Sequence, residues 1–141
     1  MAVNATVVAA TVYIVDDDPS IPRALVRLLR TAGMESFAFA SIDAFLAADI
    51  APGGACVIAD VRLDHDDGLR IPQLLAARDT RLPVIFLTAV DTEDMRVRAH
   101  QAGGMAFFRK PVDDQALIDT IRWVLQEPAG RANHARARHL N

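Results

Sequence analysis

The sequence predicts an α/β fold: a doubly wound sheet of five parallel strands with five helices on its two faces. The prediction rests on the pattern of the chain and on its length. Five short apolar runs alternate with segments whose apolar residues recur at helical spacing. Such alternation builds parallel strands that helices bury on both faces. The length of 141 residues suits one domain with one core.

The first strand is the run Val12–Val15, and apolar residues at helical spacing over 21–32 predict a helix after it. Gly33 is expected to end that helix, since glycine is the common residue just past a helix C-terminus. Residues 36–40 form a short and weak second strand.

Ser41 is expected to cap a second helix, in which Ile42, Phe45 and Leu46 face inward. The sequence Pro52-Gly53-Gly54 then predicts a turn into the third strand, Cys56–Asp60. Cys56 has no second cysteine to pair with and is interpreted as a small core residue.

The third helix contains Pro72, which a helix tolerates in its first turn, so this helix is expected to start near Gly68. Val84–Thr88 is the fourth strand. Asp91 is expected to cap a helix that runs to about Ala102.

A fifth strand follows over 106–110, and the last helix carries an apolar stripe. The stripe consists of Leu117, Ile118, Ile121, Val124 and Leu125.

Polar residues stand where the strands end: Asp16-Asp17 after the first, Asp60 after the third, Thr88 after the fourth and Lys110 after the fifth. Parallel strands bring their carboxyl ends to one edge of the sheet. In the flavodoxin-like order 2-1-3-4-5, the strand order reverses between the first and third strands, which end in the acids; this is the topological switch point. Clustered carboxylates suit Mg²⁺, and with the hydroxyl and the lysine they predict a phosphoryl-transfer site.

The composition, 52% hydrophobic and 23% charged, is that of a globular protein. No apolar run is long enough for a membrane helix, so we expect a cytoplasmic protein that does not bind membranes. The net charge is −3, and three arginines lie beyond Glu127. Without them 12 basic residues face 18 acidic ones, a net charge near −6, which argues against binding of nucleic acid by this domain.

Four motifs in order make the chain resemble the receiver domain of two-component response regulators. They are Val15-Asp16-Asp17-Asp18-Pro19, Asp60 with Gly68 eight residues later, Thr88-Ala89 and Lys110-Pro111. The resemblance spans residues 11–126, and the segment 107–114 is most similar to receivers that precede helix-turn-helix effector domains. The expected domains are an N-terminal tail (1–10), a receiver (11–127) and a basic tail or start of a linker (128–141).

The resemblance implies that a histidine kinase or phosphotransfer protein phosphorylates Asp60. It implies that Asp16, Asp17, Asp60 and the backbone carbonyl of Arg62 bind Mg²⁺. By the same resemblance, Lys110 and Thr88 contact the phosphoryl oxygens, and the small Ala89 gives the phosphoryl group access.

Three further expectations come from the resemblance. Thr88 and Phe107 are implied to move together as a switch, and Lys110-Pro111 to be joined by a cis peptide bond. Phosphorylation is implied to favour homodimers through the fourth helix, fifth strand and fifth helix, and an effector domain outside this chain to control transcription. One position departs from the family: Asp64 stands where proline is usual, which predicts a more mobile and more acidic loop.

Two other classes of function compete with a phosphorylation-controlled switch. The first is an enzyme on the same fold, such as a Mg²⁺-dependent phosphatase. The sequence has neither a GxxxxGK loop nor an Asp-x-Asp pair after the first strand, which disfavours that class. The second is a stand-alone receiver, or a phosphorelay or interaction module without DNA-binding output. We expect no enzymatic activity beyond the domain's own phosphorylation and dephosphorylation.

Overall fold

The computed structural model of the protein describes residues 10–50 and 54–126. Apart from Ala10, the predicted tails (1–10 and 128–141) lie outside these residues. So do Glu127, the last residue of the predicted domain, and Pro52-Gly53 of the predicted turn. Within the described parts of the chain, no helix is long and apolar enough to cross a membrane.

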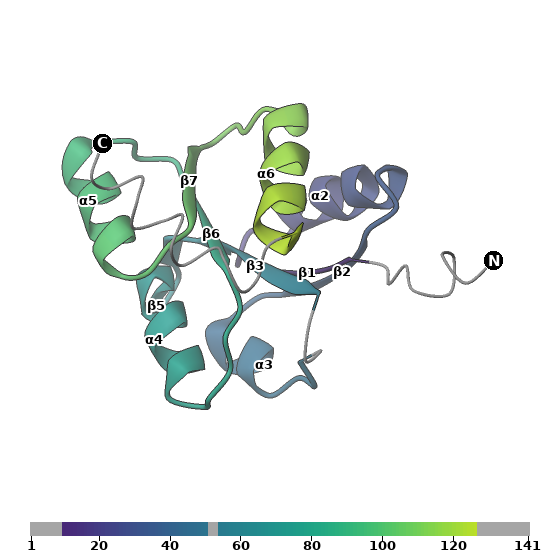
Figure 1. Ribbon diagram of the computed structural model, residues 1–141. Helices are drawn as coiled ribbons and strands as arrows, with labels where there is room; N and C mark the ends of the chain where they lie inside the picture. Colours follow the sequence, from purple (N-terminus) through teal and green to yellow (C-terminus); the bar gives the residue numbers. More distant parts are fainter. Residues whose placement is uncertain (1–9, 51–53, 127–141) are drawn as a thin grey trace.

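Five parallel strands form the central sheet in the order β2-β1-β3-β6-β7 (Figure 1). This is the predicted order 2-1-3-4-5, which is therefore confirmed. The strands are β1 (Thr11–Val15), β2 (Glu35–Phe39), β3 (Ala55–Asp60), β6 (Val84–Thr88) and β7 (Ala106–Arg109). Because β1 and β3 are neighbours, the acids that follow β1 lie beside the acid that ends β3.

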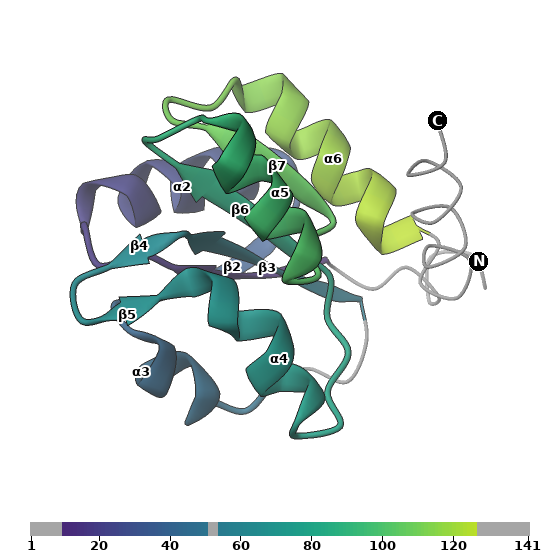
Figure 2. The same cartoon turned by 90° about the vertical axis from the view of Figure 1, so that its left-hand side faces the viewer.

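Five α-helices cover the two faces of the sheet, as predicted (Figure 2). One core lies between the sheet and α2 and α6, and the other lies between the sheet and α3, α4 and α5. Side chains of β1 alternate between them: Val12 and Ile14 face α2 and α6, while Tyr13 and Val15 face the other three helices. The helices are α2 (Ser20–Thr31), α3 (Ile42–Leu46), α4 (Ile71–Ala76), α5 (Glu93–Gln101) and α6 (Asp114–Gln126).

Two of the predicted helix starts can be checked by their capping bonds. The Ser41 hydroxyl accepts a hydrogen bond from the backbone N–H of Ala44, so this cap is confirmed. The cap predicted at Asp91 is wrong: Thr92 has the extended backbone of a capping residue, and its hydroxyl accepts from Met95. Asp91 lies one residue too early and binds Arg96 instead.

The loop after Asp60 contains a hairpin that the sequence did not predict. Its two-residue strands, β4 (Arg62–Leu63) and β5 (Asp66–Asp67), pair antiparallel. A 3₁₀ turn, Gly68–Arg70, follows and leads into α4. Pro72 is thus in the first turn of α4, as expected.

Gly68 explains why this hairpin can fold back against β3. Its N–H donates to the carbonyl of Val61 at 2.8 Å. A Cβ atom added to Gly68 would lie 1.9 Å from the carbonyl oxygen of Asp60, far inside contact distance. The position therefore requires glycine for close approach of the two backbones.

Candidate functional site

Three carboxylates meet at the carboxyl ends of β1 and β3. Asp16 and Asp17 follow β1 directly, and Asp60 is the last residue of β3. One carboxylate oxygen from each lies within 4.8 Å of those of the other two. Asp16 is 3% exposed and Asp60 is 8% exposed, so two of the three acids are largely withdrawn from water. Such a cluster needs positive charge.

Lys110 supplies one positive charge from the strand at the edge of the sheet. Its Nζ atom donates to Asp60 Oδ2 at 2.8 Å and to Asp16 Oδ2 at 3.2 Å. The lysine follows β7, whose only neighbour in the sheet is β6, so its side chain reaches past the end of β6 to the acids. Three carboxylates and one ammonium leave two negative charges, which matches a divalent cation.

The ionisation of the site follows from this arrangement. Burial raises the pKa of Asp16 above its ordinary value of 3.8, although the Asp18 amide and Lys110 oppose that shift. Burial disfavours the charge on Lys110, but its hydrogen bond to Asp60 and the charges of both acids outweigh burial and raise its pKa. The lysine therefore stays charged, while burial disfavours the charge on Asp16.

Backbone amides orient the two buried carboxylates. The N–H of Asp18 donates to Asp16 Oδ1 at 2.9 Å, and the N–H of Arg62 donates to Asp60 Oδ1 at 3.1 Å. Each carboxylate thus has one oxygen on a backbone amide and the other on Lys110. Asp18 itself is exposed, and its Oδ1 accepts hydrogen bonds from the backbone N–H and the hydroxyl of Ser20.

Other predicted site residues lie at the carboxyl ends of β6 and β7. Thr88 is the last residue of β6, next to β3 in the sheet, and is 1% exposed. Its hydroxyl oxygen accepts from the N–H of Val90 at 3.1 Å. Ala89 is exposed. The peptide bond between Lys110 and Pro111 is cis.

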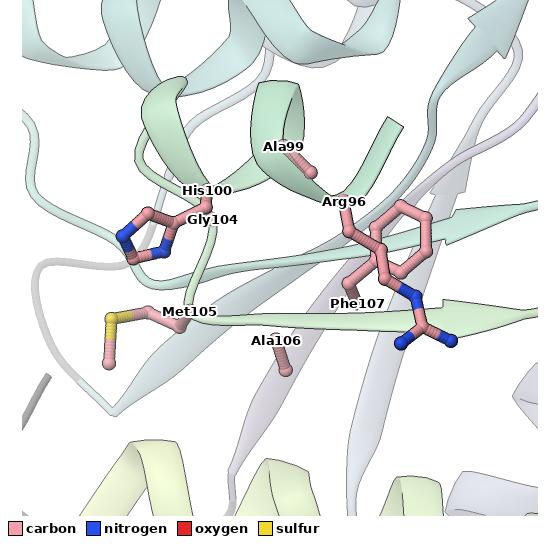
Figure 3. Close-up of a pocket in the computed structure, with 7 residues that line it drawn as sticks. All are labelled: Arg96, Ala99, His100, Gly104, Met105, Ala106 and Phe107. Carbon is pink, nitrogen blue, oxygen red and sulfur yellow. The ribbon is translucent and has the colours of Figure 1, made fainter. Parts of the chain in front are cut away.

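Phe107 is half-buried on β7 and does not join the acid cluster. It lines a hollow of about 360 Å³ between α5 and β7, drawn in Figure 3. Arg96 of α5 lines the same hollow, and in this view it lies with Phe107 at one end, while His100 and Met105 lie at the other.

The donor set suits Mg²⁺ better than a softer metal, because all three side chains offer hard carboxylate oxygens. Asp16, Asp17 and Asp60 would hold the ion. The Arg62 carbonyl, the fourth predicted ligand, belongs to the first residue of β4, directly after the β3–β4 connection.

Sequence reasoning missed three features around this site. The hydrogen bonds from the Arg62 N–H to the Asp60 carboxylate and from the Val90 N–H to the Thr88 hydroxyl have backbone donors, so no residue type at the donor position marks them in the sequence. The third is an ion pair between Asp91 and Arg96, five residues apart. The spacing of two opposite charges was visible, but helix capping was the simpler interpretation of Asp91.

Residues 12–122 match the family model of the response regulator receiver domain. Among curated proteins, the transcriptional regulatory protein TdiR of Thauera aromatica is 35% identical over 136 residues, which cover 94% of this chain and 60% of TdiR. Nodulation protein W of Bradyrhizobium diazoefficiens is 37% identical over 112 residues, which cover 79% of this chain and 49% of that protein. The chain therefore spans about half to three-fifths of the length of these relatives.

Solved structures with this fold include response regulator StyR, with a TM-score of 0.78, 34% identity, and coverage of 94% of this chain and 67% of that one. The FixJ-N structure matches with a TM-score of 0.73 and 28% identity, over 82% of this chain and 93% of that one. With the family match spanning most of the sequence, and with the acids, hydroxyl and lysine at one edge of the sheet, this chain belongs to the response regulator receiver domain family.

Proposed function

We propose that Asp60 accepts a phosphoryl group from a histidine kinase or a phosphotransfer protein. In this step a carboxylate oxygen of Asp60 forms a bond to phosphorus while the bond from phosphorus to the donor's histidine nitrogen breaks. The observation that carries the proposal is the position of Asp60: it lies within 4.8 Å of two further carboxylates and 2.8 Å from the Lys110 ammonium. Such an environment, in which a metal and an ammonium group can bind the phosphoryl oxygens, makes a carboxylate a competent nucleophile toward phosphorus.

Mg²⁺ is assigned to Asp16, Asp17 and Asp60 with the backbone carbonyl of Arg62. When bound, the ion would neutralise charge on the incoming phosphoryl oxygens. Lys110 is assigned to another phosphoryl oxygen as a point charge, which its raised pKa supports.

Thr88 and Phe107 are assigned to the switch. The Thr88 oxygen already accepts from Val90, so its O–H is available to donate to a phosphoryl oxygen. Phe107 borders a hollow between β7 and α5, which leaves room for the ring to move. Ala89 is exposed and carries a side chain too small to obstruct the approach of a phosphoryl group.

The output is a change at the face formed by α5, β7 and α6, which would favour a homodimer or a protein partner. Control of transcription in the cytoplasm is the proposed result, supported by relatives that are themselves named transcriptional regulators. The domain's chemistry is limited to its own phosphorylation and dephosphorylation.

Incubation with acetyl phosphate and Mg²⁺ tests the phosphoacceptor. Intact mass should show one acid-labile phosphoryl group on the wild type and none on Asp60→Asn. Asp66→Asn is the matched control, because Asp66 is an acid of the same loop that pairs with Arg70 rather than with Lys110. Labelling of Asp60→Asn equal to that of the wild type would contradict the assignment of Asp60 as the phosphoacceptor. Repeated turnover of acetyl phosphate would indicate an enzyme, and no labelling of the wild type would indicate an interaction module.

A further inference from the structure

The four residues between β6 and α5 are held at both ends. At one end the N–H of Val90 donates to the Thr88 hydroxyl oxygen at 3.1 Å. At the other, Arg96 in α5 donates to both carboxylate oxygens of Asp91, from Nε at 2.6 Å and from Nη2 at 2.7 Å. The segment 89–92 therefore connects the buried Thr88 to the first turns of α5 through two defined contacts.

The contact between Asp91 and Arg96 is stronger than an ordinary surface ion pair. Two parallel charge-assisted bonds fix both the distance and the plane of the carboxylate. The Asp91 side chain is 19% exposed, although that of Arg96 is 62% exposed. The hydrogen bonds from Arg96 hold the pKa of Asp91 below its ordinary value of 3.8, and the nearby charge of Arg109 lowers it further.

This ion pair has no capping role. Thr92 caps α5, so the Asp91 carboxylate is not needed to satisfy the first amides of the helix. Arg96 lies five positions after Asp91, which is outside the spacings of neighbours on a helix surface. The pair connects the loop that follows Thr88 to Arg96 of α5.

The consequence for the site lies in the Thr88 hydroxyl. While Val90 donates to its oxygen, the hydroxyl hydrogen must point to another acceptor. If the loop loosens, Val90 withdraws and the hydroxyl is free to rotate and to take up bonds that do not serve Asp60. A fixed loop thus preorganises the one donor that β6 offers at this edge of the sheet.

We propose that Asp91 and Arg96 are a positioning pair for the phosphoacceptor site: their double hydrogen bond fixes the loop 89–92 and thereby orients the Thr88 hydroxyl and Ala89 toward Asp60. The inference rests on the proposed phosphorylation of Asp60, and it adds residues that act through Thr88. Asp91 and Arg96 themselves do not contact the reacting atoms.

The experiment compares Arg96→Gln, Arg96→Lys and Asp91→Asn with the wild type. Arg98→Gln is the matched control. It removes the same charge two residues further along α5, where the arginine makes one longer contact of 3.8 Å to Asp67. All three positions are at least partly exposed, so each of the four variants is expected to fold with a melting temperature close to that of the wild type.

Two readouts separate this inference from the proposed function. Amide exchange of Val90 in the unphosphorylated protein needs no phosphorylation, and it should be about five-fold faster in Arg96→Gln and Asp91→Asn but unchanged in Arg98→Gln. The phosphorylation rate with acetyl phosphate and the lifetime of the product should change by a similar factor. Arg96→Lys should resemble Arg96→Gln, because lysine keeps the charge but cannot make two parallel bonds.

Unchanged exchange of the Val90 amide in both Arg96→Gln and Asp91→Asn would overturn the inference, whatever the phosphorylation kinetics are. Faster exchange with wild-type phosphorylation kinetics would also overturn it, because the loop would then not position Thr88. A wild type that takes up no phosphoryl group would instead contradict the proposed function, and the exchange readout would still decide whether the pair holds the loop.

Discussion

Lys110 Nζ lies 2.8 Å from Asp60 Oδ2, although the two residues are 50 positions apart in the sequence. The same ammonium group lies 3.2 Å from Asp16 Oδ2, so one lysine pairs with acids from two other strands. In this arrangement the lysine is the protein's own counter-ion for the acid cluster, and it already lies beside the oxygen that would attack phosphorus.

Lys110→Ala should slow phosphorylation by acetyl phosphate at least about ten-fold, because a charge aimed at a transferring phosphoryl group is lost. The rate of incorporation at saturating Mg²⁺ measures this. Arg109→Ala is the matched control, since Arg109 is the preceding cation and is exposed. Equal rates for Lys110→Ala and the wild type would remove Lys110 from the site.

Asp16→Asn should stabilise the metal-free protein at neutral pH. The pKa of Asp16 is raised in the folded state. A group with a raised pKa adds stability below its unfolded value and loses that contribution as the pH rises through its folded value, so ionised Asp16 weakens the fold at pH 7. The uncharged variant escapes this cost. Its melting temperature in chelator should be higher by roughly 2–5 °C at pH 7.

Three comparisons test this prediction. The advantage of Asp16→Asn should shrink as the pH falls toward 3.8, where the wild-type carboxyl group is protonated too. Asp18→Asn is the control of opposite sign, because hydrogen bonds from Ser20 lower the pKa of Asp18. Added Mg²⁺ should raise the melting temperature of the wild type more than that of Asp16→Asn. A lower melting temperature for metal-free Asp16→Asn at pH 7 would contradict the prediction.

The sequence predicts the position of each functional strand end because a buried parallel strand is a continuous apolar run that stops at a polar residue. Asp60 after Cys56–Ala59 is the clearest case. The strand order was confirmed, and with it the meeting of the β1 and β3 acids. Contacts across the fold, such as Lys110 with Asp16, depend on how far a side chain reaches and could not be read from spacing.

The predictions of short-range structure were wrong where two neighbouring residues could fill the same role. Asp91 and Thr92 are both residue types that favour helix capping, and Thr92 is the one with the extended backbone of an N-cap. The hairpin of β4 and β5 has only two residues in each strand, which is too short for an alternating pattern to show in the sequence. Asp67 caps the 3₁₀ turn that follows, because its side chain accepts from the N–H of Leu69.

Gly68→Ala should destabilise the protein by about 2–4 kcal/mol, because the new Cβ would lie 1.9 Å from the Asp60 carbonyl oxygen and force two backbones apart. Denaturant unfolding measures the loss. Gly33→Ala is the comparison: it has open space but a φ of +79°, so about 1 kcal/mol is expected from conformation alone. If the two variants lose equal stability, close approach at Gly68 does not matter.

Thr88→Ala should uncouple phosphorylation from the face formed by α5, β7 and α6. Thr88 is buried, and its hydroxyl is the group at the end of β6 that a phosphoryl oxygen would engage. A switch requires a contact that differs between two states, and this hydroxyl provides one. With beryllofluoride as a stable mimic of the phosphoryl group, amide exchange between residues 93 and 126 should change by about three-fold or more in the wild type.

In Thr88→Ala that change should be lost, while Thr88→Ser, which keeps the hydroxyl, should retain it. Phe107→Ala tests the second half of the switch, since the ring lines the hollow beside α5. It should bind beryllofluoride but transmit less of the change to α5. Sedimentation then shows whether the changed face pairs two copies, with a rise in mass expected for the wild type and Thr88→Ser alone. If beryllofluoride changes neither the amide exchange nor the sedimentation mass of the wild type, a switch at this face is contradicted, because occupancy of Asp60 would then have no effect beyond the site itself.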